Sequence, residues 1–398
     1  MRLANNMFQA LFFCHIIWCK VVWSQNEAKE VDLSQPQNSL GEVAIINLVE
    51  FHHEVYPAFH YAWQKAGYEV TTFAKNSDHL FMSSVTSNWG FSVTNITEIG
   101  KRFCRFLTII FTSVEYYDDY KFASRVIKAK CKTPTRNYVF VIHNPGVFRD
   151  SRRGVSRMKV LLSQPEIQNA YLIGLGPHIA SSLKDWIIDW GHDINIDYML
   201  PIFPLDKLHS HHKNMNFVMQ GTIHTRRRNY NSVITELFEK SSSVPNQFRL
   251  ILLGNGNYTL PVDYSPIISM LQNAAYPEYY EIIEQSIGLL TAFGSKAYLS
   301  VKASSTIAAS FICHTPLVTE SNTLNTYSYI SKTSLWIKNE GESDAAALLR
   351  IAALPDLEDQ YTTRFNSLGR DIEKMLDRNV DIVNKIMNSF KPTPVSKK

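Results

Sequence analysis

The stretch from Val43 to Phe73, VAIINLVEFHHEVYPAFHYAWQKAGYEVTTF, holds a complete strand–helix–strand unit. Residues 43–49 form a short run rich in Val and Ile, as in a strand that a parallel sheet buries on both faces. Apolar residues at helical spacing extend from Tyr56 to Ala66, and Gly67 is well placed to end that helix. Residues 68–73 supply the second strand, so the stretch predicts a βαβ unit.

The same alternation continues along the chain and forms two halves. In the first half we expect further strands at 138–143, 170–173 and 198–202, and helices at 116–130 and 179–190. In the second half we expect strands at 216–219, 249–253, 287–291 and 316–319, and helices at 229–240, 276–285, 305–312 and 343–353. This pattern predicts the α/β class, with two Rossmann-like domains facing across a cleft. Ligands of open α/β sheets bind outside the carboxyl ends of the strands, so we expect the site in that cleft.

Composition supports a globular chain of several parts. Of the 398 residues, 45% are hydrophobic and 19% are charged, which excludes a disordered, collagen-like or coiled-coil protein. The formal net charge of +4 is too small and too dispersed to predict a nucleic-acid partner. The expected parts are a targeting segment 1–24, a stem or linker 25–41, an N-terminal domain 42–202, a linker 203–213, a C-terminal domain 214–355, a long helix 356–390 and a tail 391–398.

The first 24 residues allow three interpretations. Residues 7–23 are largely apolar and follow Arg2, as in a signal peptide cleaved after Ser24. They also fit an uncleaved signal anchor, with Lys20 at the membrane interface, or an apolar helix packed on the body. The first two interpretations place the body in the secretory pathway, in the ER or Golgi lumen or outside the cell, and the second adds a membrane anchor.

Two further features bear on that location. The sequons Asn95-Ile96-Thr97 and Asn257-Tyr258-Thr259 agree with it, although such triplets are common by chance. Five cysteines are too few for a disulfide scaffold of this size. Signal cleavage would leave Cys104, Cys131 and Cys313, so a Cys104–Cys131 bridge and three buried free thiols both remain open.

The stretch Asn216–Tyr230, NFVMQGTIHTRRRNY, places a glycine and three arginines between a strand and a helix. Gly221 lies just past the strand, and Arg226, Arg227 and Arg228 stand at the helix start. Basic side chains destabilise a helix N-terminus through its dipole. A bound phosphate would offset that cost, because guanidinium and free N–H groups would converge on it. A solvated basic turn is the alternative.

A second candidate phosphate site follows the strand expected at 287–291. Ser304, Ser305 and Thr306 can cap the next helix, which consists of small and apolar residues. Their hydroxyls, the backbone amides and Lys302 could hold a diphosphate. The alternative is a simple cap on a buried helix.

The second half resembles the donor-binding domain of GT-B glycosyltransferases of the broad group-1 type, clearly over residues 214–335. Gly221 with Arg226 and Arg227 resembles the loop that faces the donor diphosphate. Leu252–Gly256 resembles the next strand and its glycine turn, which contains Gly254. Lys302–Thr319, ending in Thr315-Pro316-Leu317-Val318, resembles the helix and the Pro-bearing strand that line the donor pocket. The resemblance implies a GT-B fold whose long C-terminal helix crosses back to the first domain.

The chain departs from the retaining members of that group, which carry two glutamates eight positions apart before the Pro-bearing strand. Val301 and Ala309 occupy those positions, and His314 replaces the usual glycine. No catalytic carboxylate therefore carries over from those members, and Lys302–Thr306 is more similar to divergent eukaryotic ones.

The resemblance also implies residues on the acceptor side. Inverting GT-B enzymes place a base in the loop after the first strand, ahead of a proline, and alignment on Pro57 gives Glu54 with His53 beside it. His143 ends another strand and is a candidate acceptor contact. Glu320 follows the Pro-bearing strand and is a candidate contact for the donor sugar or ribose. The alternatives are that Glu54 only starts a helix, that the histidines are packed within the protein and that Glu320 lies in an exposed loop.

No cofactor or metal is expected. His209, His211 and His212 lack a partner ligand at the spacing of a zinc site, and GT-B enzymes usually need no bound metal. The resemblance therefore implies a glycosyltransferase that moves a sugar from a nucleotide sugar, with UDP or GDP, to the hydroxyl of a glycan, lipid or protein. A glycosyltransferase-like protein that binds without catalysis and a sugar-nucleotide epimerase remain alternatives.

Overall fold

The computed structural model describes residues 40–49, 53–76, 79–128, 137–149, 152–167, 169–187, 194–205, 214–224, 227–256, 258–260 and 266–390. The expected targeting segment, most of the stem, most of the linker and the tail lie outside these described residues. Within them, none of the helices has the length and apolar character that a membrane span requires.

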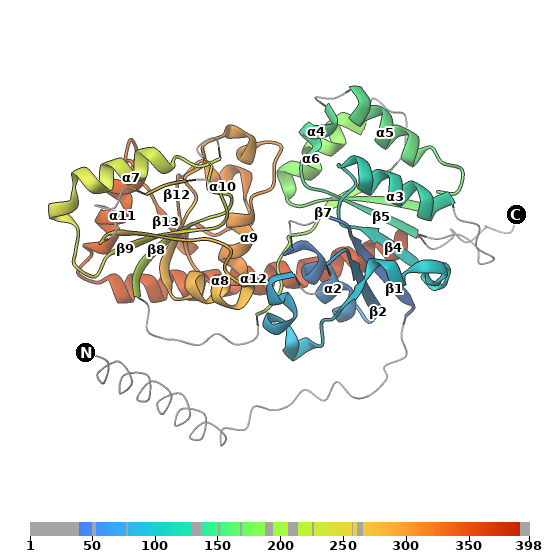
Figure 1. The fold of residues 1–398 in the computed structure, drawn as a ribbon, viewed down its shortest axis with the longest axis horizontal. Helices are drawn as coiled ribbons and strands as arrows, with labels where there is room; N and C mark the ends of the chain where they lie inside the picture. The colour runs from blue at the N-terminus through green and yellow to red at the C-terminus, as the bar shows by residue number, and fades with distance from the viewer. Residues whose placement is uncertain are drawn as a thin grey trace, which may run out of the picture. The chain divides into compact units, whose positions relative to one another are not determined.

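The first sheet has seven parallel strands in the order β3-β2-β1-β4-β5-β6-β7 (Figure 1). Helices α2, α3, α4, α5 and α6 connect or follow these strands. The strands are Glu42–Asn47 (β1), Glu69–Ala74 (β2), Val93–Asn95 (β3), Thr108–Phe111 (β4), Asn137–Ile142 (β5), Asn169–Gly174 (β6) and Asn195–Tyr198 (β7). The helices are Val55–Lys65 (α2), Tyr117–Lys128 (α3), Pro145–Arg149 (α4), Arg152–Leu162 (α5) and Pro177–Ile187 (α6).

The second sheet has six parallel strands in the order β10-β9-β8-β11-β12-β13. The strands are Asn214–Gln220 (β8), Arg249–Leu253 (β9), Ile268–Leu271 (β10), Ser286–Leu290 (β11), Leu317–Thr319 (β12) and Leu335–Ile337 (β13). The helices are Tyr230–Glu239 (α7), Tyr276–Glu284 (α8), Ser305–Ile312 (α9), Thr323–Thr326 (α10), Asp344–Ala352 (α11) and Leu357–Ser389 (α12). The predicted α/β architecture of two Rossmann-like domains is therefore confirmed.

The strand expected at 198–202 is partly wrong. β7 ends at Tyr198, and residues 199–202 belong to no strand. Pro201 has no N–H to give to a sheet, and the backbone of Leu200 is bonded to a side chain of α12 instead of a strand. Four short strands, β3, β4, β10 and β13, were not predicted from the sequence.

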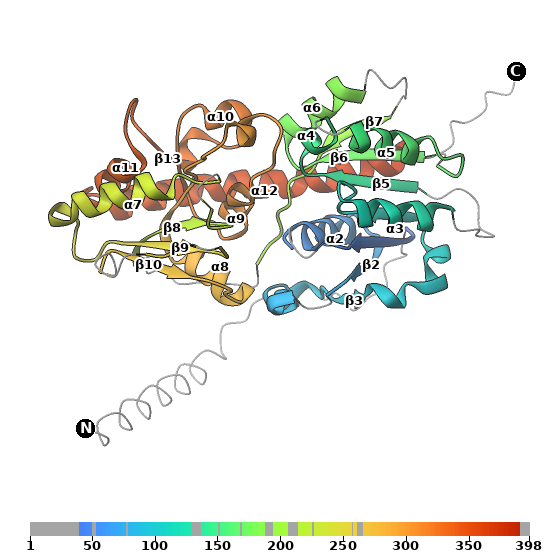
Figure 2. The same ribbon diagram turned by 45° about the horizontal axis from the view of Figure 1, so that its top comes forward.

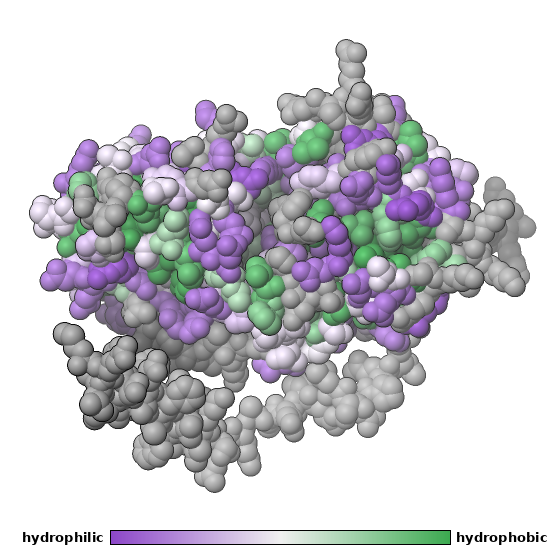
Figure 3. Space-filling view, in the orientation of Figure 1, coloured by the Kyte–Doolittle hydropathy of each residue, from purple (hydrophilic) through white to green (hydrophobic). Residues whose placement is uncertain are grey.

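Alternate residues of β1 enter different cores, as a strand buried on both faces requires. Val43 and Ile45 pack with α2 and α12 in a core that continues into the second domain. Ala44 and Ile46 pack on the opposite face with α3, α5 and α6. A third core lies between the second sheet and helices α7 and α11. On the face seen in Figure 3, hydrophilic and hydrophobic residues are interspersed over both domains.

Helix α12 is 33 residues long and packs on both domains, on α2 of the first and on β13 of the second (Figures 1 and 2). Two buried polar side chains fix it. Asp371 accepts hydrogen bonds from Ser331 N at 2.8 Å and from the hydroxyls of Ser331 and Ser334, each at 2.6 Å. Asn379 bonds both the N–H and the carbonyl of Leu200, at 3.1 and 2.9 Å. The predicted C-terminal helix that crosses back is confirmed.

The cysteines differ from one of the two open interpretations. Cys104 is disulfide-bonded, and Cys313 is buried and not disulfide-bonded. Three free thiols are therefore excluded. The bonding partner of Cys104 lies outside the described residues.

We predict that Asn379→Ala lowers the free energy of unfolding by about 2–4 kcal/mol, because it leaves a buried N–H and a buried carbonyl without their partner. Urea denaturation followed by circular dichroism would measure it. Asn384 is exposed on the same helix, so Asn384→Ala is the matched control and should change stability by less than about 0.5 kcal/mol. Equal effects of the two substitutions would contradict the role given to Asn379.

Candidate active site

The strand order of each sheet reverses at one point, and both reversals face one cavity. In the first sheet the switch lies between β1 and β4, and in the second between β8 and β11. Crevices of this kind are where open α/β sheets bind ligands. A cavity of about 540 Å³ is lined by residues that follow β1, β4 and β5 on one side and β8, β9 and β10 on the other.

Most of the residues predicted from sequence meet in this cavity. From the first domain these are His53, Glu54 and His143, and from the second Gly221, Arg227, Gly254, Lys302 and Ser305. Arg226 lies outside the described residues. Ser304, Thr306 and Glu320 are placed elsewhere, as described below.

The loop after β1 presents His53 and Glu54 at the start of α2. His53 is buried, and its Nδ1 lies 3.3 Å from the hydroxyl of Tyr56. Its ring also meets the ring of Tyr276 edge-on, with 6.0 Å between centroids. Because Tyr276 begins α8 of the second domain, this histidine lies where the two domains touch.

Glu115, which the sequence analysis did not single out, organises the carboxyl ends of β4 and β5. Its Oε1 accepts hydrogen bonds from the backbone N–H groups of His143 at 2.7 Å and Asn144 at 2.6 Å. The His143 ring donates from Nε2 to the carbonyl of Thr112 at 2.5 Å. Glu115 and His143 are thus bound to backbone while both line the cavity.

Two hydrogen bonds join this part of the first domain to residues 302–303 of the second domain. The carbonyl of His143 accepts from the backbone N–H of Ala303 at 3.1 Å. The ring of His178 donates from Nε2 to the carbonyl of Lys302 at 3.2 Å. Burial lowers the pKa of His178, which keeps that ring neutral near pH 7. The loop that precedes α9 is therefore held from the first domain.

In the second domain, two glycines allow two strand ends to approach closely. Gly221 and Gly254 have φ values of 114° and 147°, which side chains rarely adopt. A Cβ at Gly254 would overlap the carbonyl group of Gly221. The sequence prediction of a glycine turn after each of these strands therefore has a steric reason.

Segments 227–229 and 292–294 pair across the switch point of the second sheet. Arg228 and Phe293 form an antiparallel bridge, Asn229 N donates to Ala292 O at 3.2 Å, and Gly294 N donates to Arg227 O at 3.1 Å. This pairing turns the side chain of Arg228 inward and leaves Arg227 exposed at the cavity.

The guanidinium of Arg228 is buried, with 3% of the residue exposed. It lies over the rings of Phe293 and Tyr298 at 5.3 and 5.1 Å, and its Nη2 donates to the hydroxyl of Thr306 at 2.6 Å. Its Nε has no acceptor, and among the described residues it forms no ion pair with a carboxylate. A buried cation in this state is costly.

Ser305 and Thr306, adjacent in sequence, have different surroundings. Ser305 begins α9 and lines the cavity, whereas Thr306 is fully buried and accepts bonds from Arg228 and from Gln220 at 3.0 Å. Tyr279 completes the network by donating its hydroxyl to Gln220 at 2.8 Å. Thr306 therefore supports the cavity from beneath through Arg228 and Gln220.

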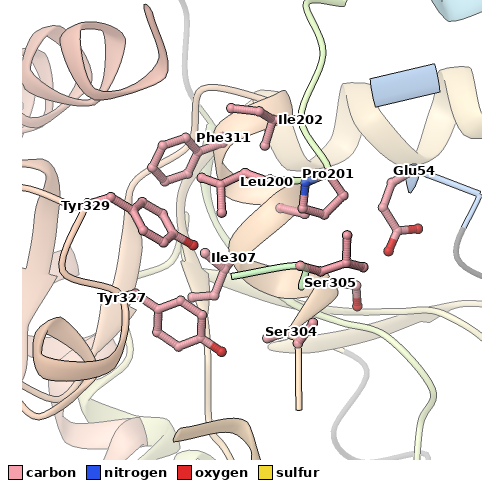
Figure 4. A pocket seen from close by; sticks show the side chains of 13 residues that line it. Glu54, Leu200, Pro201, Ile202, Ser304, Ser305, Ile307, Phe311, Tyr327 and Tyr329 are labelled. Carbon is pink, nitrogen blue, oxygen red and sulfur yellow. The ribbon is translucent and has the colours of Figure 1, made fainter. Parts of the chain in front are cut away.

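Ser304 lines a second, small cavity of about 20 Å³ (Figure 4). Figure 4 shows Glu54 and Ser305 at this cavity too, opposite the side chains of Phe311, Tyr327 and Tyr329. The Ser304 hydroxyl is buried without a hydrogen-bond partner among the described residues. The volume suits one water molecule.

Glu320 lines a separate cavity of about 520 Å³ at the carboxyl ends of β11 and β12. Its carboxylate contacts Lys338 at 3.5 Å and accepts a hydrogen bond from Asn322 at 3.0 Å. Arg227 lines the 540 Å³ cavity and Glu320 lines the 520 Å³ one, so the structure does not bring the two residues together in one cavity. Its predicted contact with the donor stays a prediction.

No group of three or more metal-ligating side chains occurs among the described residues. His209, His211 and His212 lie outside them. The prediction that no metal is bound therefore stays a prediction.

Comparison with known proteins identifies the fold. No family model matches the chain, and no curated protein matches it. Among solved structures, an alpha-glucosyltransferase in complex with UDP and DNA has a TM-score of 0.58 at 15% identity, covering 86% of this chain and 99% of that one. HepE of Anabaena, in complex with UDP, has a TM-score of 0.55 at 10% identity, covering 88% and 100%. Sucrose-phosphate synthase of Thermosynechococcus elongatus has 0.53 at 11%, covering 88% and 98%. The chain has the GT-B fold, as predicted.

We predict that Glu115→Ala lowers the free energy of unfolding by about 2–4 kcal/mol, because the N–H groups of His143 and Asn144 lose their shared acceptor. Glu115→Gln keeps an oxygen at that place and should cost less than half as much. Chemical denaturation would compare the two variants. If the glutamine variant were as unstable as the alanine variant, the charge and not the hydrogen bonds would matter.

Asp119, on the first turn of α3, supplies a pH-dependent test. Burial raises the pKa of its carboxyl to about 6, against about 3.9 in an unfolded chain. Between those values the folded state binds more protons than the unfolded state, so this residue makes stability fall as pH rises from about 4 to 6. We predict that Asp119→Asn is more stable than the wild type by about 1–3 kcal/mol at pH 7.5. The advantage should vanish near pH 4 in melts across this range, and a pH-independent difference would contradict the assignment.

Proposed function

We propose that the chain is a glycosyltransferase that transfers a sugar from a nucleotide sugar to the hydroxyl of an acceptor. The GT-B fold and a cavity at the switch points of both sheets support this function. The observation that carries it is Arg228, a buried cation without a carboxylate partner in the described part of the chain. An anion that binds at the donor side would supply the missing partner.

The proposed place of the donor diphosphate is the floor of the cavity, between the loop after β8 and the start of α9. Free N–H groups and the dipole of α9 favour an anion at Ser305. Arg227 and Lys302 line the same cavity, and Arg228 adds positive charge through its bond to Thr306. Such preorganised charge would stabilise the diphosphate as the glycosidic bond breaks. Two of the similar structures hold UDP, so UDP-sugars are the donors to test first.

The acceptor hydroxyl would approach from the first domain, beside His53 and Glu54. A general base has to lie within hydrogen-bond reach of the proton that it removes. Both residues line the cavity opposite the donor side, and either could take that proton. We also propose that His143 contacts the acceptor on this side, where Glu115 holds its loop in place.

A protein that binds a nucleotide sugar without transferring it is the second candidate, and one observation favours it. Ala309 lines the cavity at a position where retaining relatives of the group-1 type carry a glutamate. Binding of UDP without sugar release or transfer would support this candidate. Interconversion of free sugar nucleotides would instead support an epimerase.

We also propose that the protein works in the secretory pathway, after signal cleavage or on a signal anchor. The disulfide bond of Cys104 supports this location, because disulfides persist mainly in oxidising compartments. The sequon Asn95 agrees with it: the Asn95 Oδ1 accepts bonds from Thr97, which leaves the amide nitrogen as the group available for glycosylation.

The test of the proposed function is the effect of Arg228→Met on UDP binding and on stability. Methionine fills similar space without charge, so UDP affinity, measured by calorimetry, should fall at least tenfold, the equivalent of about 1.4 kcal/mol. The melting temperature without ligand should equal or exceed that of the wild type, because an uncompensated buried charge is removed.

Arg249 is the matched control. Like Arg228 it donates to backbone carbonyls, but it lies at the first residue of β9, whereas the cavity lies past the last residue of that strand. Arg249→Met should leave UDP affinity unchanged. Wild-type UDP affinity in Arg228→Met, or failure of the wild type to bind UDP, GDP or their sugars, would refute the proposal.

A further inference from the structure

The acceptor-side wall of the 540 Å³ cavity carries three apolar side chains among its polar ones. Leu80 follows β2, Tyr116 follows β4 and Val147 follows β5, and all three line the cavity. Tyr116 is 45% exposed, Val147 is 38% exposed, and Phe81, beside Leu80, is 62% exposed. Exposed apolar side chains that cluster at a cavity indicate a binding surface.

The backbone at Leu80 and Phe81 is strained. Their φ values are 49° and 60°, in the left-handed region that bulky residues rarely adopt. The strain is held by neighbours: the side chain of Met82 is fully buried, and the hydroxyl of Ser84 donates to the carbonyl of Phe81 at 2.8 Å. Segment His79–Val85 also packs against α8 of the second domain. Strain maintained beside a cavity, with an apolar side chain left in solvent, indicates a functional cause.

Two polar groups of this wall are engaged with the protein. Glu115 Oε1 binds two backbone N–H groups, and the Nε2 of His143 binds a backbone carbonyl. An acceptor rich in hydroxyls would need several convergent polar partners along the wall. Leu80, Tyr116 and Val147 instead add apolar surface, and Glu54, His53 and Asn144 line the same wall.

We propose that the acceptor is an amphipathic alcohol, a molecule with an apolar body and a hydroxyl at one end. The body would lie on Leu80, Phe81, Tyr116 and Val147, and the hydroxyl would reach His53 and Glu54. This inference rests on the proposed function and names the class of its acceptor. Burial of the exposed side chains by the ligand supplies affinity without specific hydrogen bonds.

The test uses two probes with identical hydroxyls, hexyl β-glucoside and methyl β-glucoside, added to the full chain saturated with UDP. Calorimetry should show hexyl glucoside binding at least tenfold more tightly, because only its alkyl chain covers the apolar wall. Equal affinities, or binding of neither probe to the UDP-bound protein, would overturn the inference. Intact UDP binding in the same titrations shows that such a failure is not a failure of the proposed function.

Phe81→Gly gives a readout that a merely structural role would not produce. Glycine adopts the left-handed conformation without strain, so the melting temperature should rise, while the preference for hexyl over methyl glucoside should fall at least threefold. Tyr116→Ser should also reduce the preference, and Tyr116→Phe should retain it. Phe238→Ser, which changes an exposed phenylalanine on α7 in the other domain, is the control and should leave it unchanged.

Two outcomes would contradict the assignment of the wall. One is an unchanged preference in both Phe81→Gly and Tyr116→Ser. The other is sugar transfer to duplex DNA that carries hydroxymethylated bases, the kind of molecule bound by the similar alpha-glucosyltransferase, without transfer to hexyl glucoside.

Discussion

The structure depends on one constraint, the attachment of α12 to both domains through buried side chains that bond backbone. Asp371 satisfies Ser331 and Ser334 of the second domain, and Asn379 satisfies Leu200 at the exit from the first sheet. Around these anchors one hydrophobic core runs from β1 and α2 to α8 and α9. The cavity lies between the domains, so its shape depends on this helix, although α12 contributes no residue to its lining.

The two walls of the cavity differ in their chemistry. The wall from the second domain collects positive charge at the start of α9 and behind it, where Arg228 is buried against aromatic rings. The wall from the first domain combines the apolar side chains of Leu80 and Val147 with Glu54 and His53. This division suits a reaction in which one reactant is an anion and the other is bound by its shape and apolar surface.

Much of the fold could be predicted from sequence because the long strands and helices are strongly periodic. The strand Glu42–Asn47, the helix Val55–Lys65 and the glycines after β8 and β9 were all predicted from local patterns, with bounds that differ by a residue or two. β4 could not be predicted, because four residues between irregular segments carry no measurable period. Glu115 follows that strand, so its place at the switch point was hidden as well.

In the candidate site, the orientation of single side chains could not be predicted from the sequence either. Of three consecutive arginines, the resemblance pointed to Arg226 and Arg227, whereas the distant pairing of Arg228 with Phe293 turns the side chain of Arg228 inward. The start of α9 is similar: one step along a helix turns the side chain by about 100°, which puts Ser305 in the cavity and Thr306 beneath it. Tertiary packing, and not residue type, decides which of two adjacent side chains faces the cavity.

The contact between the domains at residues 302–303 has an evolutionary consequence. Both bonds end on main-chain groups of that loop, the N–H of Ala303 and the carbonyl of Lys302. Almost any residue at these positions provides the same N–H and carbonyl, so mutations there can accumulate without separating the domains. A contact between domains that uses main-chain groups leaves little trace in a sequence alignment. This is one physical reason why structures that share only 10–15% of their residues with this chain can keep its architecture.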